Sequence, residues 1–577
     1  MNVSSHSLLP LALFLLFLGG YVPAAWRITI RFLHYFQQEE YDNRRFLRWW
    51  MRSRSFEKRA TLLALVLGLA LLVHPRLTLP LPPPEDSRLL IAAGIMAALL
   101  ALAGLSNKSR NVKKALVMTA RAKRIFTVCL LLQTAAFPGE TVCFWISSIF
   151  TDVMPGWIFS LTLLSFAAAL FAIPLFLVAA NWILIPVESR IQQRYLNEAR
   201  EILARVKPHI IGITGSYGKT STKHILDHIL AMHAPSLATP GSVNTLMGIT
   251  RIIRERLKPE HAFFIVEMGA YGIGSIQKLC GLTPPKTAIV TAVGVAHMER
   301  FKTIETVARA KSELPRALPP DGFAILNGDN PHVRAMASGI QAKAYFYGRN
   351  AEAGPLDCRL VQDESTATGS HCVLEYNEKT YTFDLPLHGA PQALNAAGAF
   401  LAGILMGVPP LTAVAALQTV PPISHRLVVQ RGTDGITTID DAYNSNPIGF
   451  ASALQVLQSL PGGRKFLVTP GMVELGSESE SAHRQLAPLA ALACDRIALV
   501  APGRIPSFVS GLLEKGFPRD NLCEFNTLGD ARNWLQTELR PGDVVLFEND
   551  LPDLYEEPSA FTLFGGETDN TFSRTQN

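Results

Sequence analysis

The stretch HIIGITGSYGKTSTKHILDHIL, residues 209–230, decides the fold of this chain. Its first residues are mostly β-branched, which is typical of a buried parallel strand. A turn containing Gly215 and Gly218 follows, and the apolar residues after Lys219 recur at intervals of three and four, as in a helix. The stretch therefore predicts a strand, a tight loop and a helix. In such a unit the loop amides and the helix N-terminus are directed at one point.

This geometry suits a phosphate group. Lys219 would reach the β- and γ-phosphates, and the Thr220 hydroxyl would hold Mg2+. The pattern is not the strict G-x-x-x-x-G-K-[ST], because Ile213 stands where the first glycine belongs, so a chance match is the alternative for this motif taken alone. The residues expected to bind nucleotide here are Gly215, Ser216, Tyr217, Gly218, Lys219, Thr220 and Ser221.

The composition separates the chain into two parts. Its 577 residues are enough for several domains, and 48% of them are hydrophobic. The mean hydropathy is +0.21, and the apolar excess lies before about residue 187. The net charge of +6 comes largely from basic loops between apolar runs, which favours membrane topology over nucleic-acid binding. The seven cysteines form no C-x-x-C pair, so neither a zinc site nor a disulfide framework is indicated.

Residues 1–187 are predicted to form a transmembrane region of about five helices, since a crossing takes about 20 apolar residues. A signal peptide is the alternative for the first run, but its basic residues follow it rather than precede it. Basic segments at 27–59 and 106–124 are predicted to be cytoplasmic, which also places everything after residue 187 in the cytoplasm of a bacterial cell. The predicted spans are 8–26, 60–74, 89–105, one within 125–150, and 157–186.

The rest of the chain is predicted to be α/β in character. A charged linker helix at 188–206 leads into an ATP-binding domain at 207–420. A second, Rossmann-like α/β domain follows at 421–560, and a polar tail at 561–577 is expected to be disordered. The fold class is therefore multi-domain, with a transmembrane helical region before two α/β domains.

Three side chains beyond the loop are candidates for metal binding or catalysis. Glu267 closes a buried strand beside the phosphate loop, where a carboxylate can ligate a metal, although a solvent-facing glutamate is an equal alternative. His297 follows the next strand, and a lone histidine there is more often a surface residue. Lys311 lies on a helix, where a single lysine is usually a solvated charge.

The order of motifs adds to these residues. TGSYGKTST, VEMGA, VGVAHMERF, ARAKSE and LNGDNP follow one another as they do in the central domain of the Mur ligases, the ATP-dependent amide ligases of cell-wall peptide assembly. The resemblance implies that Glu267 and His297 bind Mg2+ and that Lys311 is carbamoylated to complete the metal site. The helix at 388–408 resembles the family's N-A-x-A-A helix, which would place Asn395 near the adenine.

A later motif is more discriminating. ITTIDDAYNSNPIGFASAL, 436–454, resembles the D-D-S-Y-N-A-N-P motif of the D-alanyl-D-alanine-adding Mur ligases, with Ala442 for Ser. ISHRLVVQ, 423–430, resembles the family's G-R-x-E segment, with serine-histidine before Arg426 and Val in place of Glu after it. The resemblance implies that Asp441 holds the nucleotide and that Arg426 contacts its phosphates. It covers about 207–550.

The chain departs from this pattern at both ends. Membrane spans stand where the family has a UDP-sugar-binding domain. GDVVLFENDLPDLY, 542–555, replaces G-D-x-V-L-x-K-G-S, which puts the incoming amine in doubt. The segment FENDLPDLY resembles a membrane-anchored branch of the family.

Together these features predict a membrane-anchored, ADP-forming ligase that joins a carboxylate to an amine through an acyl phosphate, in peptidoglycan precursor assembly. Its expected cofactors are ATP and Mg2+, and its expected catalytic residues are Lys219, His297 and Lys311. The expected partners are an amine, amino acid or dipeptide, a carboxylate acceptor linked to UDP or to a lipid, and the bilayer, with no nucleic acid. A polyglutamate-synthase-type ligase and a non-catalytic nucleotide-binding scaffold are the alternatives, and a GTPase or transporter ATPase ranks below both.

Overall fold

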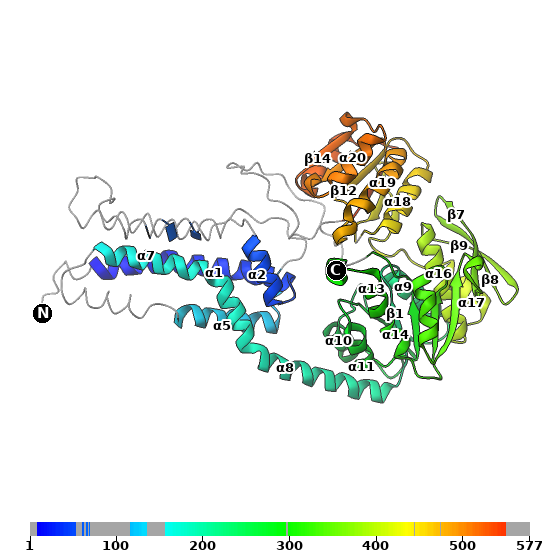
Figure 1. Cartoon of the computed structure of the whole chain (residues 1–577), viewed down its shortest axis with the longest axis horizontal. Coiled ribbons are helices and arrows are strands. Elements are labelled where there is room, and N and C mark those ends of the chain that lie inside the picture. Colours follow the sequence, from blue (N-terminus) through cyan, green and yellow to red (C-terminus); the bar gives the residue numbers. More distant parts are fainter. Residues whose placement is uncertain are drawn as a thin grey trace. The chain divides into compact units, whose positions relative to one another are not determined.

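The computed structural model describes residues 9–52, 61, 62, 65, 66, 69, 116–135, 156–295, 298–443, 445–473 and 475–549 (Figure 1). The chain divides into two compact units, Met1–Gln192 and Gln193–Asn577. The predicted span at 89–105 and the predicted tail at 561–577 lie outside the described residues, as does most of the predicted span at 60–74.

The first unit is helical where it is described. Its interior is an apolar cluster to which Ile28, Phe36, Phe46, Ile125 and Leu177 belong. One buried polar pair crosses this core, with Gln133 Nε2 donating to Thr29 Oγ1 over 3.0 Å. The helices that begin in this unit are α1 (Leu9–Gln38), α2 (Asn43–Arg52), α5 (Ala120–Ala135), α7 (Gly156–Phe171) and α8 (Ile173–Val206).

The helix bounds differ from the expected ones in two places. The predicted last span, 157–186, is broken between α7 and α8, where Pro174 sits in the first turn of α8, as proline favours. The predicted linker at 188–206 is not a separate helix, because α8 continues without a break from Ile173 to Val206. Among the described residues, α8 is the one helix found long and apolar enough to cross a membrane, by length and composition alone.

The second unit contains two sheets. The first has the strand order β2-β3-β1-β4-β5-β6-β7-β8-β9, parallel up to β7 and antiparallel from β7 to β9. The antiparallel strands form a strand-rich flank beside the parallel part of the sheet. The strands are β1 (His209–Thr214), β2 (Ser236–Ala238), β3 (Phe263–Glu267), β4 (Thr287–Val290), β5 (Phe323–Asn327), β6 (Lys343–Gly348), β7 (Cys358–Thr366), β8 (Gly369–Tyr376) and β9 (Lys379–Leu385).

Helices cover both faces of this sheet. Ile211 and Ile213 of β1 point to the face covered by α9 and α16, whereas Ile210 points to the face covered by α10 and α11. This alternation along one strand explains why the adjacent residues Ile210 and Ile211 are both apolar. The helices are α9 (Lys219–Ala231), α10 (Leu246–Arg256), α11 (Ser275–Leu282), α12 (Met298–Phe301), α13 (Ile304–Lys311), α14 (Glu313–Arg316), α15 (Pro331–Arg334), α16 (Ala390–Leu405) and α17 (Pro410–Leu417).

The second sheet has the order β10-β11-β15-β12-β13-β14, and all of its pairs are parallel except β10 with β11. One face carries a larger apolar cluster with α18, α19 and α20, and the other carries a smaller one with α21. Its elements are β10 (Val428–Arg431), β11 (Thr437–Asp441), α18 (Pro447–Ser459), β12 (Lys465–Thr469), α19 (Ser479–Ala493), β13 (Arg496–Val500), α20 (Pro506–Glu514), β14 (Leu522–Phe525), α21 (Leu528–Glu538) and β15 (Val544–Glu548).

Both sheets gather polar side chains at the carboxyl ends of their strands. In the first, β1 and β3 end at the phosphate loop and at Glu267, with Ile213 in register with Glu267. In the second, β11 and β15 end in register at Asp441 and Glu548. The carboxyl edge of an open α/β sheet is the usual place for a ligand, so these ends define the candidate site.

Candidate functional site

The phosphate loop has the predicted strand–loop–helix form. Gly218 precedes α9 in the left-handed conformation, at φ +79°, which a glycine adopts without steric cost. The loop is fixed to the chain after β4 by two contacts of Ser216. Its backbone N–H donates to the Ala292 carbonyl over 2.7 Å, and its hydroxyl bonds to the backbone of Gly294. A side chain at Gly215 would come within 1.9 Å of Thr291 Oγ1, so the loop also needs glycine there.

Lys219 is the first residue of α9. Its ammonium donates to the Gly215 carbonyl over 2.7 Å, which holds it against the loop that it is expected to serve. Burial lowers the pKa of Lys219, while the charge of Glu267 acts in the opposite direction. The Lys219 ammonium is poorly solvated and lies at the N-terminus of α9, and this combination favours binding of an anion.

Glu267 is buried at the end of β3 and is surrounded by donors. Its Oε2 accepts from the Thr220 hydroxyl and from the Lys223 ammonium, each over 2.9 Å. Its Oε1 accepts from Asn244 Nδ2 over 3.1 Å. Burial alone would raise the pKa of this carboxyl, but the positive charges of Lys223 and Lys219 outweigh that effect, and the pKa is lowered. Glu267 is therefore an anion at neutral pH, and the solvent-facing alternative is wrong.

The residues present fit a divalent cation. The Thr220 hydroxyl and the Glu267 carboxylate are oxygen donors in contact with each other, and a cation, the Lys223 ammonium, already occupies the same carboxylate oxygen. His297 lies outside the described residues. Within the described part of the chain, no group of three or more His, Cys, Asp or Glu side chains is arranged to hold a metal ion, so a metal here would need the modified lysine or His297 to complete its ligands.

Lys311 is not the solvated charge that a lone helical lysine usually is. It ends α13 with 4% of its surface exposed. Burial, reinforced by the nearby positive charge of Lys219, lowers the pKa of Lys311 well below its ordinary value. A lowered pKa favours the neutral amine, which is the form that can add CO2.

Asn395 lies against the phosphate loop. It belongs to α16, and a side chain at Gly218 would come within 2.5 Å of Asn395 Oδ1. The predicted helix is thus confirmed, and its asparagine packs beside the turn that precedes Lys219.

Two further predicted site residues, Arg426 and Asp441, come from the second sheet and the segment before it. The guanidinium of Arg426 stacks on the Tyr443 ring at 4.5 Å, and its charge influences the pKa of Lys219. Asp441 Oδ1 accepts from the backbone N–H of Leu427 over 3.2 Å. Arg426 therefore acts electrostatically on Lys219 of the phosphate loop, and its contact with phosphates stays a prediction. Asp441 faces Glu548 on the neighbouring strand.

The sequence prediction missed four residues of this arrangement: Lys223, Asn244, Ser445 and Glu548. For Lys223 a signal was available, since it lies four residues after Lys219 and so shares its helix face. Glu548 stands where the family pattern has lysine, and only the pairing of β11 with β15 brings it beside Asp441.

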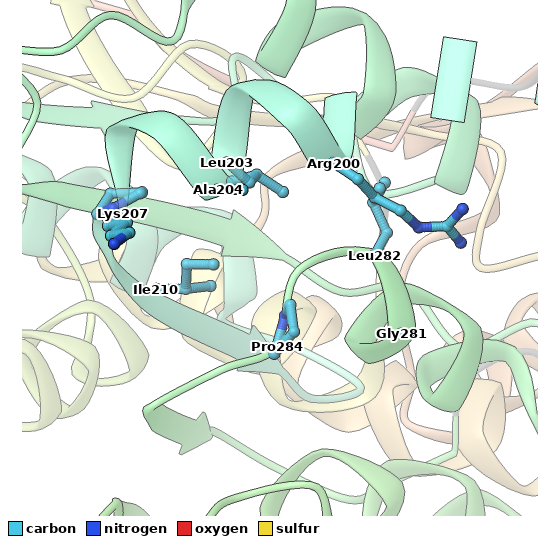
Figure 2. Close-up of a pocket in the computed structure, with 9 residues that line it drawn as sticks. Arg200, Leu203, Ala204, Lys207, Ile210, Gly281, Leu282 and Pro284 are labelled. Carbon is cyan, nitrogen blue, oxygen red and sulfur yellow. The ribbon is translucent and has the colours of Figure 1, made fainter. Parts of the chain in front are cut away.

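A cavity of about 410 Å³ lies elsewhere in the second unit (Figure 2). Figure 2 shows it between the last turns of α8 and the end of α11, with Ile210 on its floor. It opens beside the start of β1, whereas the phosphate loop follows the end of that strand. The cavity is therefore not part of the candidate site. Its lining is Arg200, Leu203, Ala204, Lys207, Pro208, Ile210, Gly281, Leu282 and Pro284.

Both α/β parts of the chain match models of known protein families. A family model described as the Mur ligase middle domain matches residues 213–403, and one described as the Mur ligase, glutamate ligase domain matches residues 425–548. Both ranges lie within the second unit.

Individual relatives agree with this match. The UDP-N-acetylmuramoyl-tripeptide–D-alanyl-D-alanine ligase of Mycobacterium bovis is 34% identical over 362 residues, which is 58% of this chain and 69% of the relative. The Bacillus subtilis enzyme of the same name is 30% identical over 371 residues, 62% of this chain and 79% of the relative. Among solved structures, the MurF ligase of Thermotoga maritima in complex with ADP is similar with a TM-score of 0.55 and 26% identity, covering 63% of this chain and 81% of that one.

Proposed function

Because the chain belongs to the Mur ligase family and is an ATP-dependent ligase close to MurF, we propose that it joins a dipeptide of the D-alanyl-D-alanine class to the carboxylate of a nucleotide- or lipid-linked muramoyl peptide. The observation that carries this proposal is the contact between Thr220 of the phosphate loop and the buried carboxylate of Glu267. It brings phosphate-binding groups and a cation-binding group to one place, as phosphoryl transfer requires.

In this mechanism the acceptor carboxylate takes the γ-phosphoryl group of ATP, and the resulting acyl phosphate is attacked by the amine. Lys219 and the N–H groups at the start of α9 bind and orient the phosphates. Arg426, held on Tyr443, supplies a second positive charge from the other sheet. Mg2+, held by Thr220, Glu267, His297 and carbamoylated Lys311, would offset the negative charge that accumulates on the phosphates.

The first unit is proposed to anchor the ligase to the bacterial inner membrane as a multi-pass protein, with the α/β domains in the cytoplasm. Support comes from the length and apolar composition of α8 and from α2, on which Arg44, Arg48 and Arg52 are exposed at intervals of four. The opposite side of α2 buries Phe46 and Trp50. A short helix with one cationic and one apolar side suits the interface of an anionic membrane.

The test is ADP release from the purified full-length protein with UDP-N-acetylmuramoyl-tripeptide and D-alanyl-D-alanine. Lys219→Ala should reduce the rate at least about 100-fold, because the residue acts on phosphate charge. Lys258→Ala, at an exposed surface lysine of the same domain, is the matched control and should leave the rate unchanged. Turnover of Lys219→Ala within a few-fold of the parent would remove the phosphate loop from the mechanism.

A further inference from the structure

Two carboxyl groups face each other at the carboxyl edge of the second sheet. Asp441 ends β11 and Glu548 ends β15, and the two residues are register partners on parallel strands. Side chains at register positions of adjacent strands point to the same face, so the carboxyl groups are forced together. The backbone N–H of Asn549 donates to the Asp441 carbonyl over 3.1 Å, which holds the two strand ends in place.

The surroundings of the pair provide few hydrogen-bond donors. Glu548 is fully buried, and its Oε1 accepts from the Ser445 hydroxyl. Its Oε2 receives no hydrogen bond from an N–H or hydroxyl group of the described residues, and the carboxyl group of Asp441 lies within hydrogen-bonding reach of the Glu548 side chain. Two carboxyl groups can hydrogen bond to each other only if one of them holds a proton.

The charged groups near the pair do not remove this requirement. Arg426, from the segment before β10, acts on both carboxyl groups through its charge, but forms no ion pair with either among the described residues. Asp440, the preceding residue of β11, adds a negative charge and is itself paired with His425 at 2.8 Å. Burial, the largest effect, raises the pKa of Asp441 to about 6 and that of Glu548 well above its ordinary value. The register geometry and the direction of both pKa shifts favour a pair that shares one proton and carries one negative charge.

Of the reactants in the proposed ligation, only the incoming amine has a charge that would be attracted to this negatively charged carboxyl pair. ATP and the acceptor carboxylate are anions, which a carboxylate repels. The incoming amine arrives as an ammonium ion and must lose a proton before it can attack.

We infer that the Asp441–Glu548 pair receives the ammonium group of the incoming substrate and accepts its proton. This rests on the proposed ligase function, and it assigns Asp441 to the amine rather than to the nucleotide contact that the resemblance implied.

The step balances as follows. One N–H proton of the ammonium passes to the unprotonated carboxylate, so that both carboxyl groups are then neutral. The nitrogen lone pair forms a C–N bond to the acyl carbon, and the C–O bond to phosphate breaks with its electrons going to the phosphate oxygen. A second nitrogen proton leaves with the phosphate, giving the amide and hydrogen phosphate.

Hydroxylamine separates this role from the rest of the reaction, because it is already uncharged at neutral pH and traps acyl phosphates without a base. With UDP-N-acetylmuramoyl-tripeptide and ATP, Glu548→Gln should form the hydroxamate within about two-fold of the parent. With D-alanyl-D-alanine as the amine, it should form the amide about 100-fold more slowly, the lower end of the range for general base catalysis. Asp441→Asn should behave in the same way. Glu514→Gln, at an exposed carboxylate of the same domain, should change neither rate.

Equal losses of hydroxamate and amide in Glu548→Gln would overturn the inference. Failure of the parent itself to form any hydroxamate would instead count against the proposed function. A second readout does not need turnover. The infrared spectrum of the parent at pH 7 should contain a protonated carboxyl band that Glu548→Gln lacks and Glu514→Gln retains, and its absence from the parent would also overturn the inference.

Discussion

The ammonium nitrogen of Lys223 lies 2.9 Å from Oε2 of Glu267, and both side chains are almost completely buried. This ion pair joins the first turns of α9 to the end of β3, and Thr220 bonds to the same oxygen. The pair thus connects the phosphate loop to the carboxylate expected to bind a cation.

Removing one partner of this pair should destabilise the protein strongly. Lys223→Met would leave the Glu267 carboxylate buried without its main cation, which typically costs about 3–5 kcal/mol. We expect a clearly lower melting temperature for this variant, measured on the purified full-length protein. The double variant Lys223→Met with Glu267→Gln should recover most of the loss, because no charge is then left unpaired. A melting temperature of Lys223→Met equal to that of the parent would show that the pair contributes nothing to folding.

The Asp441–Glu548 pair should make stability depend on pH in a defined direction. Both pKa values are raised in the folded protein, so the folded state holds a proton that the unfolded state releases at lower pH. The part due to Asp441 is fully present below the unfolded pKa of aspartate, about 3.9, and is lost as the pH rises through about 6, whereas the part due to Glu548 persists to higher pH. Melting temperatures of the parent should therefore fall more between pH 5 and pH 7.5 than those of Glu548→Gln. Identical pH dependence in the two proteins would show that Glu548 does not raise the pKa of Asp441 and would contradict the coupling of the two carboxyl groups.

Much of the first sheet could be predicted from the sequence because its signals are local. The β-branched run before Gly215 and the helical spacing after Lys219 each lie within one element, and both are observed. The burial of Lys311 could not be predicted this way, since it depends on neighbours distant in sequence. Without the resemblance to a family, that lysine looked like an ordinary surface charge.

The contacts of the second sheet were harder to predict for the same reason. Asp441 and Glu548 are more than a hundred residues apart, and only the order β11-β15-β12 makes them neighbours. β15 is the last described strand in chain order, yet it lies between β11 and β12, and no local sequence pattern predicts that position. The replacement of the motif's lysine by Glu548 can be seen in the sequence. Its proximity to Asp441 cannot, because it depends on the pairing of β11 with β15.

Lys311 provides a test in which the functional and structural roles predict different results. Its lowered pKa favours the neutral amine, the form that can take up CO2, and carbamoylation would convert it into an anionic metal ligand. Lys311→Ala should lose ADP formation and regain part of it when a small carboxylate such as acetate or formate is supplied. Lys311→Arg should remain inactive, because guanidinium keeps its charge and cannot be carbamoylated. Full activity of Lys311→Arg would show that the residue is not a metal ligand.

The proposed membrane topology makes the last prediction, and it bears on whether the ligase can reach ATP. Reporter fusions after residues 56, 115 and 200 should all be cytoplasmic, and a fusion after residue 82 should be external, according to the distribution of Lys and Arg. Substituting Arg44, Arg48 and Arg52 together with Gln should weaken the cytoplasmic signal at residue 56, because these exposed cations would retain that segment on the inner side. A fusion after residue 200 that reports from outside the cytoplasm would separate the phosphate loop from its nucleotide, and would rule out the proposed arrangement whatever the other fusions show.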